Sequence, residues 1–258
     1  TVVPLVWLRY NTVVALEPLT IYEILQIAMD AYAMFFSENM VLPDPFPGLV
    51  RLETEVVDIA AELLGGGQVV QGTMTSGGTE SIFLAIKAAR DWAKAHRSID
   101  GIPEIVVPRS AHPTFNKAAY FLDLKVIRVA LGPDYRADVG AMQRAINQNT
   151  VMLVGSAPGY PHGKIDPIGE LGKLAQAQGL WLHVDACVGG FFAPFVRKLG
   201  CQLPDFDFTV PGVTSLSADL HKHGYTGKGA SIVLFRSQDH SQHRVFDFTD
   251  WPRGRYKT

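Results

Sequence analysis

The sequence has few cysteines and no marked excess of charge of either sign. Its 258 residues include two cysteines, Cys187 and Cys201, which are too few for a disulfide framework. We therefore expect both thiols to be reduced, as is usual in cytoplasmic proteins. The formal net charge of −2 gives no electrostatic reason to expect nucleic acid or an anionic membrane as a partner.

Long apolar segments and targeting features are also missing. No apolar run approaches the roughly 18 residues that a membrane-spanning helix needs, so we expect no membrane span in this chain. The N-terminus has neither the basic start nor the apolar centre of a signal peptide. These absences favour a cytoplasmic protein. Because the sequence begins with Thr1, a parent protein anchored through a missing N-terminal segment stays open.

Apolar strands that alternate with amphipathic helices make up most of the sequence. We predict helices near 20–40, 49–64, 80–95, 138–147 and 168–178, and strands near 104–108, 125–131, 151–156, 180–186 and 230–235. This alternation indicates an α/β fold with a mainly parallel sheet and helices on both faces. We divide the chain into an N-terminal helical segment, 1–64, and a large domain, 65–258. Ligands of such sheets bind beyond the carboxyl ends of the strands.

A segment of small residues stands immediately before the helix predicted from Glu80. Ser76, Gly77, Gly78 and Thr79 let the backbone approach an anion closely, and the free N–H groups of the helix point at it. The pattern suits a phosphate group. An ordinary glycine-rich loop with Thr79 as the helix cap is the alternative.

Asp185 lies at the end of the apolar strand predicted at 180–186. A buried carboxylate is costly there unless it meets a positive partner, and a protonated pyridine nitrogen is such a partner. A structural ion pair and a helix cap are the alternatives. A metal site would have two candidate ligands, His183 and Asp185, and we predict none.

Lys222 lies between two histidines, His221 and His223, just before the strand predicted at 230–235. A lysine among cationic neighbours in a confined site can have a lowered pKa and attack a carbonyl carbon as an amine. A solvated surface lysine is the alternative. The order of anion cradle, strand-end aspartate and lysine favours the first interpretation. These three features match the phosphate, the ring nitrogen and the aldehyde of pyridoxal 5′-phosphate (PLP).

His112 is a fourth candidate. It follows the strand predicted at 104–108, so we expect it at the same edge of the sheet. A flat imidazole at this edge can stack on a cofactor ring. Taken alone, His112 is better explained as an ordinary loop histidine.

Several long segments carry a family resemblance. They are TSGGTES (75–81), GSAPGYPHGKIDPI (155–168), HVDACVGGFFAPF (183–195), PGVTSLSADLHKHGYTGKGAS (211–231) and TDWPRGRY (249–256). From about residue 22 onward the chain resembles the group II decarboxylase family of PLP enzymes, which have the type I fold of PLP-dependent transferases. In detail it is most similar to the members that cleave phosphorylated sphingoid bases. The DACVGG and GSAP runs favour these lyases over the aromatic amino acid and glutamate decarboxylases.

The resemblance implies roles for the candidate side chains. It assigns Lys222 to the Schiff base with PLP, Asp185 to the pyridine nitrogen and His112 to the face of the ring. Lys228 is implied near the active site, for substrate binding or proton transfer. The cofactor phosphate is assigned to the loop that includes Ser76 and to His221, through Gly77, Gly78, Thr79 and His221.

The implied reaction is a retro-aldol cleavage. The amine of a phosphorylated sphingoid base displaces Lys222, a base removes the proton of the neighbouring hydroxyl, and the C2–C3 bond breaks. Asp185 keeps the ring nitrogen protonated, so the carbanion delocalises into the ring. The expected products are a long-chain aldehyde and phosphoethanolamine, and the expected assembly is a homodimer with active sites at the subunit interface. Amino acid decarboxylation and an inactive, truncated PLP-binding remnant are the alternatives.

The sequence departs from the lyase pattern in two places. The lyases usually carry Asn-x-x-His-Pro, whereas this chain has Asn39 followed by Leu42 and Pro43. Asn39 is therefore kept as a substrate-binding candidate, but Leu42 weakens recognition of the substrate phosphate. The chain stops at Thr258, and we expect the small C-terminal domain of the family to be missing.

Overall fold

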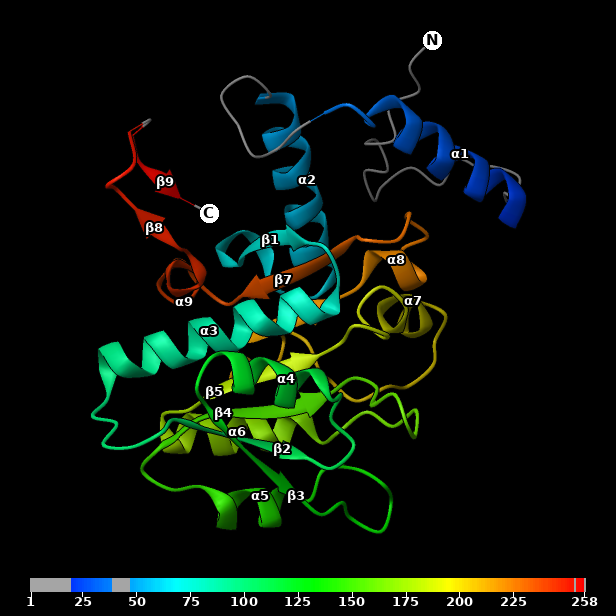
Figure 1. Cartoon of the computed structure of the whole chain (residues 1–258). Helices are drawn as coiled ribbons and strands as arrows, with labels where there is room; N and C mark the ends of the chain where they lie inside the picture. Colours follow the sequence, from blue (N-terminus) through cyan, green and yellow to red (C-terminus); the bar gives the residue numbers. More distant parts are fainter. Residues whose placement is uncertain (1–19, 39–46, 253, 258) are drawn as a thin grey trace. The chain divides into compact units, whose positions relative to one another are not determined.

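The computed structural model describes residues 20–38, 47–252 and 254–257 (Figure 1). The chain divides into two compact units, residues 1–37 and 38–258. In the described residues, none of the helices has the length and apolarity of a membrane span.

The first unit contains helix α1 (Ile21–Met34). Thr20 caps it, because the Thr20 side chain accepts a hydrogen bond from the Glu23 N–H while the Glu23 carboxylate accepts from the Thr20 N–H at 2.7 Å. This reciprocal pair is a capping box, and it fixes where the helix begins. The helix predicted near 20–40 is confirmed, and it ends at Met34.

The second unit is built around a seven-stranded sheet with the order β1-β7-β6-β5-β4-β2-β3. Strands β2 to β6 pair in parallel, and β7 lies antiparallel to both β1 and β6. The predicted mainly parallel sheet is confirmed. The strands are β1 (Gln71–Thr75), β2 (Glu104–Pro108), β3 (Lys125–Val129), β4 (Thr150–Ser156), β5 (Trp181–Asp185), β6 (Ser215–Ala218) and β7 (Ser231–Phe235).

Helices join the strands, and a small two-stranded sheet lies near the end of the chain. The helices are α2 (Pro47–Leu63), α3 (Gly78–His96), α4 (Thr114–Phe121), α5 (Val139–Ala145), α6 (Ile168–Gln178), α7 (Ala193–Lys198), α8 (Leu220–His223) and α9 (Gln238–Ser241). Two 3-10 helices, η1 (Gly67–Val69) and η2 (Gln242–Arg244), and strands β8 (Asp247–Phe248) and β9 (Tyr256–Lys257) complete the described elements.

Both faces of the sheet are buried under helices, as predicted. Alternate residues of a strand point to opposite faces, so Val106 packs in one core with α2, α5 and α6, whereas Ile105 and Val107 pack in another with α3 and α4. All five residues of β2 are buried. Such continuous burial is expected of a parallel strand that is covered on both faces.

The strand register brings polar side chains together at one edge of the sheet. Ser156 ends β4 opposite Asp185, the last residue of β5, and Asp185 lies opposite Ser217 in β6. Asp219 follows β6 directly, and α3 begins three residues after β1. The parallel strands therefore deliver their carboxyl ends to the N-terminus of α3, which is where an α/β fold binds its ligand.

Candidate active site

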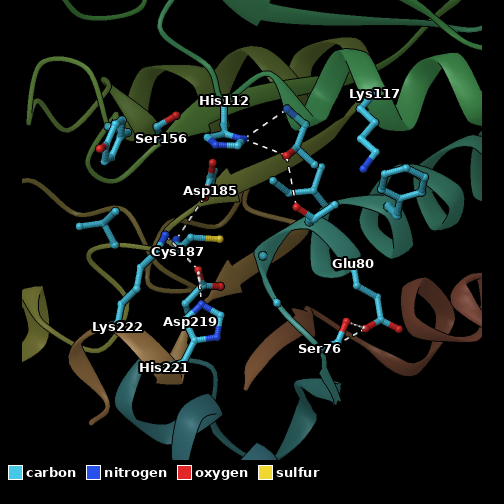
Figure 2. Close-up of a pocket in the computed structure, with 18 of the residues that line it drawn as sticks. Ser76, Glu80, His112, Lys117, Ser156, Asp185, Cys187, Asp219, His221 and Lys222 are labelled. Carbon is cyan, nitrogen blue, oxygen red and sulfur yellow. Dashed lines mark hydrogen bonds and ion pairs between the residues drawn. The ribbon is translucent and has the colours of Figure 1, made fainter. Parts of the chain in front are cut away.

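A pocket of about 720 Å³ opens at this edge of the sheet (Figure 2). Eight of the residues predicted for the site line it together: Ser76, Gly77, Gly78, Thr79, His112, Asp185, His221 and Lys222. They come from four places in the sequence. The segments that carry these residues therefore meet at one cavity, and the roles assigned to the residues stay predictions.

The N-terminus of α3 forms one wall of the pocket. The first hydrogen bond of the helix runs from the Ser81 N–H to the Gly77 carbonyl at 3.1 Å. The N–H groups before Ser81 therefore have no acceptor within the helix. A Cβ on Gly78 would lie 2.7 Å from Cys187 Sγ and 3.0 Å from Asp219 Oδ1. A side chain here would displace its neighbours, and glycine leaves a bare backbone at a helix N-terminus, which is the geometry of an anion site.

Ser76 and Thr79 have defined partners in this wall. The Ser76 N–H and hydroxyl both bond to Glu80 Oε2, each at 2.6 Å, so Glu80 braces the turn. The helix cap is Gly77 rather than Thr79, which corrects the alternative based on a Thr79 cap. Thr79 Oγ1 instead lies 3.5 Å from the Thr114 hydroxyl on α4.

Asp185 is half-buried at the tip of β5. Its Oδ1 accepts from the N–H of Cys187 at 3.1 Å. Within the residues that the structure describes, Asp185 forms no ion pair, so the alternative of a structural ion pair has no cation to support it. An uncompensated carboxylate facing a cavity is suited to a cationic ligand atom.

A buried polar network links β5 to the neighbouring strand β6. His183 is fully buried, with Nδ1 2.8 Å from Ser215 Oγ and Nε2 3.3 Å from Ser217 Oγ. Burial lowers the pKa of His183 to about 3, so the ring is neutral. Both ring nitrogens have protein partners, and among the described residues no cluster of side chains could hold a metal ion.

Lys222 has an acidic environment, which corrects the sequence-based expectation of cationic neighbours. Its Nζ lies 3.0 Å from Asp219 Oδ2 in an ion pair. Burial alone would lower the pKa of Lys222, but the hydrogen bond and the charge of Asp219 outweigh it, and the pKa is raised. The lysine is therefore an ammonium ion in this state. The prediction of a lowered pKa considered the two neighbouring histidines and overlooked Asp219. The Asp219 carboxylate forms an ion pair with Lys222 Nζ, and this contact raises the pKa.

His112 occupies the loop between β2 and α4. Its Nδ1 accepts from the Thr114 N–H at 3.2 Å and lies 2.8 Å from the Thr114 hydroxyl. Arg128 on β3 holds the same loop by donating to the carbonyls of Arg109 (3.1 Å) and Ala111 (3.0 Å). The contacts of Thr114, after His112, and of Arg109 and Ala111, before it, thus hold the ring at the pocket.

The remaining candidates have different positions. His221 Nδ1 accepts from the Ala230 N–H at 3.1 Å, which ties α8 to β7. Lys228 donates to the His221 carbonyl at 3.1 Å but is not among the residues that line the pocket, so its catalytic role stays a prediction. Asn39 lies outside the described residues.

Sequence reasoning missed Asp219 and the wall formed by Cys187. Asp219 is buried and lines the pocket beside Lys222, three residues further along. A signal existed, since an acid three residues before a lysine on a helical turn can pair with it. Burial raises the pKa of Cys187, and the charges of Asp185 and Asp219 raise it further, so its thiol stays protonated.

The residues fit pyridoxal phosphate. The Gly78 wall can accept a phosphate, Asp185 can hold a proton on a pyridine nitrogen, and Lys222 offers an amine to an aldehyde carbon. A cavity of about 720 Å³ is within the usual range for a small-molecule site.

Comparisons with known proteins agree with this site. The family model "Pyridoxal-dependent decarboxylase conserved domain" matches residues 19–249. A sphingosine-1-phosphate lyase of Arabidopsis thaliana is 50% identical over 232 residues, which cover 88% of this chain and 42% of the relative. A probable L-tyrosine/L-aspartate decarboxylase of Methanothermobacter thermautotrophicus is 40% identical over 81% of the chain and 56% of its own length.

A solved structure shows the same architecture. The sphingosine-1-phosphate lyase of Burkholderia pseudomallei has a TM-score of 0.88 and 40% identity over 92% of this chain and 56% of that one. The chain thus spans about half the length, or less, of the relatives it matches. The family match covers most of the chain and supports PLP as the cofactor. The chain belongs to the pyridoxal-dependent decarboxylase family.

Proposed function

We propose that the protein is a PLP-dependent carbon–carbon lyase that cleaves phosphorylated sphingoid bases to a long-chain aldehyde and phosphoethanolamine. The observation that carries the proposal is the convergence of the α3 N-terminus, Asp185 and Lys222 on one pocket, in a chain 40–50% identical to several sphingosine-1-phosphate lyases. The geometry supports the cofactor, and the lyase relatives support the substrate class.

Each residue contributes one physical task. Bound PLP supplies an aldehyde carbon for an amine and a ring that withdraws electrons. The backbone at Gly78 and the His221 ring would hold the phosphate, and the Asp185 carboxylate would keep a proton at the ring nitrogen. His112 would contact the ring, and Lys222 would offer its amine to the aldehyde carbon. Removing a proton from the substrate hydroxyl is a task we assign to Lys228.

The substrate and the assembly extend beyond the pocket. We assign Asn39 to the substrate, beside the position where Leu42 replaces the histidine of the lyase pattern. We also propose a homodimer with the pocket at the subunit interface and a cytoplasmic location, which two reduced cysteines favour.

Product analysis tests the reaction. The full-length protein, loaded with PLP, would be offered sphingosine-1-phosphate in one vessel and a panel of amino acids in another, with Lys222→Ala as the matched control. We expect aldehyde and phosphoethanolamine from the first and no carbon dioxide from the second. Carbon dioxide released from an amino acid, with no aldehyde from the lipid, would overturn the proposed reaction.

Decarboxylation is the second candidate. It rests on the 40% identity to the probable L-tyrosine/L-aspartate decarboxylase, which has the same family domain. A decarboxylase breaks the bond to the carboxyl carbon on the same cofactor, so Lys222 and Asp185 do not discriminate between the reactions. The lyase relatives reach higher identity over more of the chain, so we place the lyase first.

A further inference from the structure

Asp219 is the buried acid that none of the sequence motifs brought to notice. It follows β6, and its side chain is 4% exposed. One oxygen, Oδ2, lies 3.0 Å from Lys222 Nζ and 3.5 Å from His221 Nε2. The other, Oδ1, accepts a 2.6 Å hydrogen bond from the hydroxyl of Ser231 in β7.

The position of this carboxylate is set by its surroundings. The Ser231 hydroxyl on β7 holds Oδ1 by its hydrogen bond. On the other side the backbone of Gly78 is close, since a Cβ on this residue would lie 3.0 and 3.2 Å from the two carboxylate oxygens. Lys222 comes from the short helix α8, and its side chain is 37% exposed toward the pocket (Figure 2). The acid is therefore buried and held from β7, whereas the lysine side chain is partly exposed in the pocket.

The charges around Lys222 are mostly negative. Burial opposes its protonated form, whereas the hydrogen bond and charge of Asp219 and the charge of Asp185 favour it. In the described part of the chain, Asp219 is the carboxylate that comes within ion-pair distance of Lys222 Nζ. A buried carboxylate held in one position can bind the ammonium of a partly exposed lysine beside it.

We propose that Asp219 is the counter-ion that receives Lys222 as an ammonium ion whenever this side chain is released from the cofactor, and so favours exchange of Lys222 for the substrate amine. The inference rests on the proposed function, because it concerns the lysine that holds PLP. In the exchange, the carbon–nitrogen double bond passes from the lysine nitrogen to the substrate nitrogen. The protons that the substrate ammonium gives up end on Lys222, beside Asp219.

Competitive labelling of the cofactor-free chain tests the ion pair without any catalysis. Trace acetic anhydride at a series of pH values, followed by mass spectrometry of each lysine, gives the apparent pKa of Lys222. Asp219→Asn keeps the shape and removes the charge, and we expect the value to fall by about one unit or more. Asp185→Asn is the matched control: it removes a charge from the same pocket, but from a carboxylate that forms no ion pair with Lys222, and we expect a smaller fall.

Lys117 on α4, which also lines the pocket, serves as the internal reference and as a check of folding. An unchanged Lys222 value in Asp219→Asn, or an equal fall in Asp185→Asn, would overturn the proposal. If Asp219→Asn does not fold, the wild-type chain decides: we expect the pKa of Lys222 to lie above the ordinary lysine value of 10.5, and a value below it would overturn the ion pair.

Capture of PLP provides a second measurement whose sign separates a counter-ion from a structural support. At pH 7.5 we expect Asp219→Asn to hold PLP on Lys222 about tenfold more tightly, because each unit of lowered pKa makes tenfold more neutral amine available. A merely structural Asp219 predicts weaker capture in the variant, which would contradict the proposal. Wild-type capture that persists in Lys222→Ala would instead overturn the proposed function and leave the labelling result standing.

Discussion

The buried side chain of His183 on β5 makes the stability of the fold depend on pH. Its ring is neutral because burial lowers its pKa to about 3, and both nitrogens bond to serines of β6. In the unfolded chain the same ring has a pKa near 6.5. The unfolded state therefore binds a proton first as the pH falls, and stability is lost from about pH 6.5 down toward pH 3.

We predict that the free energy of unfolding falls by about 2 kcal/mol more between pH 7 and pH 5 in the wild type than in His183→Gln, which does not titrate in this range. Urea denaturation at the two pH values measures both differences. Equal pH dependence in the two proteins would show that His183 is not held neutral by the fold.

Gly78 is the second residue on which the pocket depends. We predict that Gly78→Ala lowers the free energy of unfolding by about 1–3 kcal/mol and weakens PLP binding, because the new Cβ meets Cys187 and Asp219. Gly169→Ala in the first turn of α6 is the control, since nothing lies within 4 Å of its Cβ, and we expect it to be neutral or stabilising. Thermal melts and absorbance titrations with PLP compare them, and equal effects would contradict the close-packing argument.

At this scale the sequence predicted which residue types the site contains, but not their charge state. Asp185 could be placed because it ends a recognisable strand, Gly78 because it precedes a helix, and Lys222 because it comes shortly before the strand predicted at 230–235. The ion pair with Asp219 was missed although the three-residue spacing signals it, because the burial of Asp219 depends on how α8 turns back against β7. The expected histidine effect on Lys222 failed for that reason.

Among the elements, the loop that carries His112 depends on strand β3. Arg128 donates to three of its carbonyls, those of Arg109, Ala111 and His112. It also donates to Asn116 Oδ1 on α4, from Nε at 2.8 Å and Nη2 at 2.6 Å. A planar guanidinium can serve several acceptors at once, whereas an ammonium is a single point charge.

We predict that Arg128→Lys increases amide hydrogen exchange in residues 109–112 and lowers the free energy of unfolding by about 1–3 kcal/mol, because carbonyl acceptors lose their donors. Lys125→Met on the same strand is the control; it removes an ammonium that is 60% exposed and pairs with Glu104. Exchange in the loop that stays at the wild-type rate in Arg128→Lys would contradict this bracing role.

Elements with a clear apolar or helical pattern were predictable, and elements without such a pattern were not. Helix α6 begins and ends where its periodicity and Gly179 indicate, with Gly179 left-handed at φ 59°. Strands β1 (QGTMT) and β6 (SLSA) carry small and polar residues, so their burial depends on neighbouring strands rather than on an apolar pattern. Helices α4 and α8 are too short to show a helical period, although they carry Lys117 and Lys222.

For the whole molecule, the second unit has a continuous sheet with a core on each face, as the alternating pattern predicted. Its surface also includes aromatic rings beside the pocket. Tyr120 and Phe121 on α4 are 80% and 64% exposed, and Phe121 contacts Phe83, which lines the pocket, at 5.9 Å between ring centroids. Exposed apolar groups at a site mouth are typical of a surface that is covered in an assembly.

We therefore predict that light scattering gives the mass of a dimer, twice the 28.2 kDa of the chain, and that Phe121→Glu shifts it toward the monomer. A charge in a buried apolar interface is costly, whereas on a free surface it has little effect. Ile102→Glu, at an exposed residue outside α4, is the control. A wild-type monomer at all concentrations would contradict the proposed homodimer.

The central claim is that Lys222 holds PLP in a pocket shared with Asp185 and the α3 N-terminus. Borohydride reduction of the PLP-treated chain followed by peptide mass spectrometry tests it most directly. We predict that the pyridoxyl group is found on Lys222, with loss of the yellow absorbance in Lys222→Ala. A reduced adduct on another lysine, or an unchanged spectrum in the variant, would contradict the account.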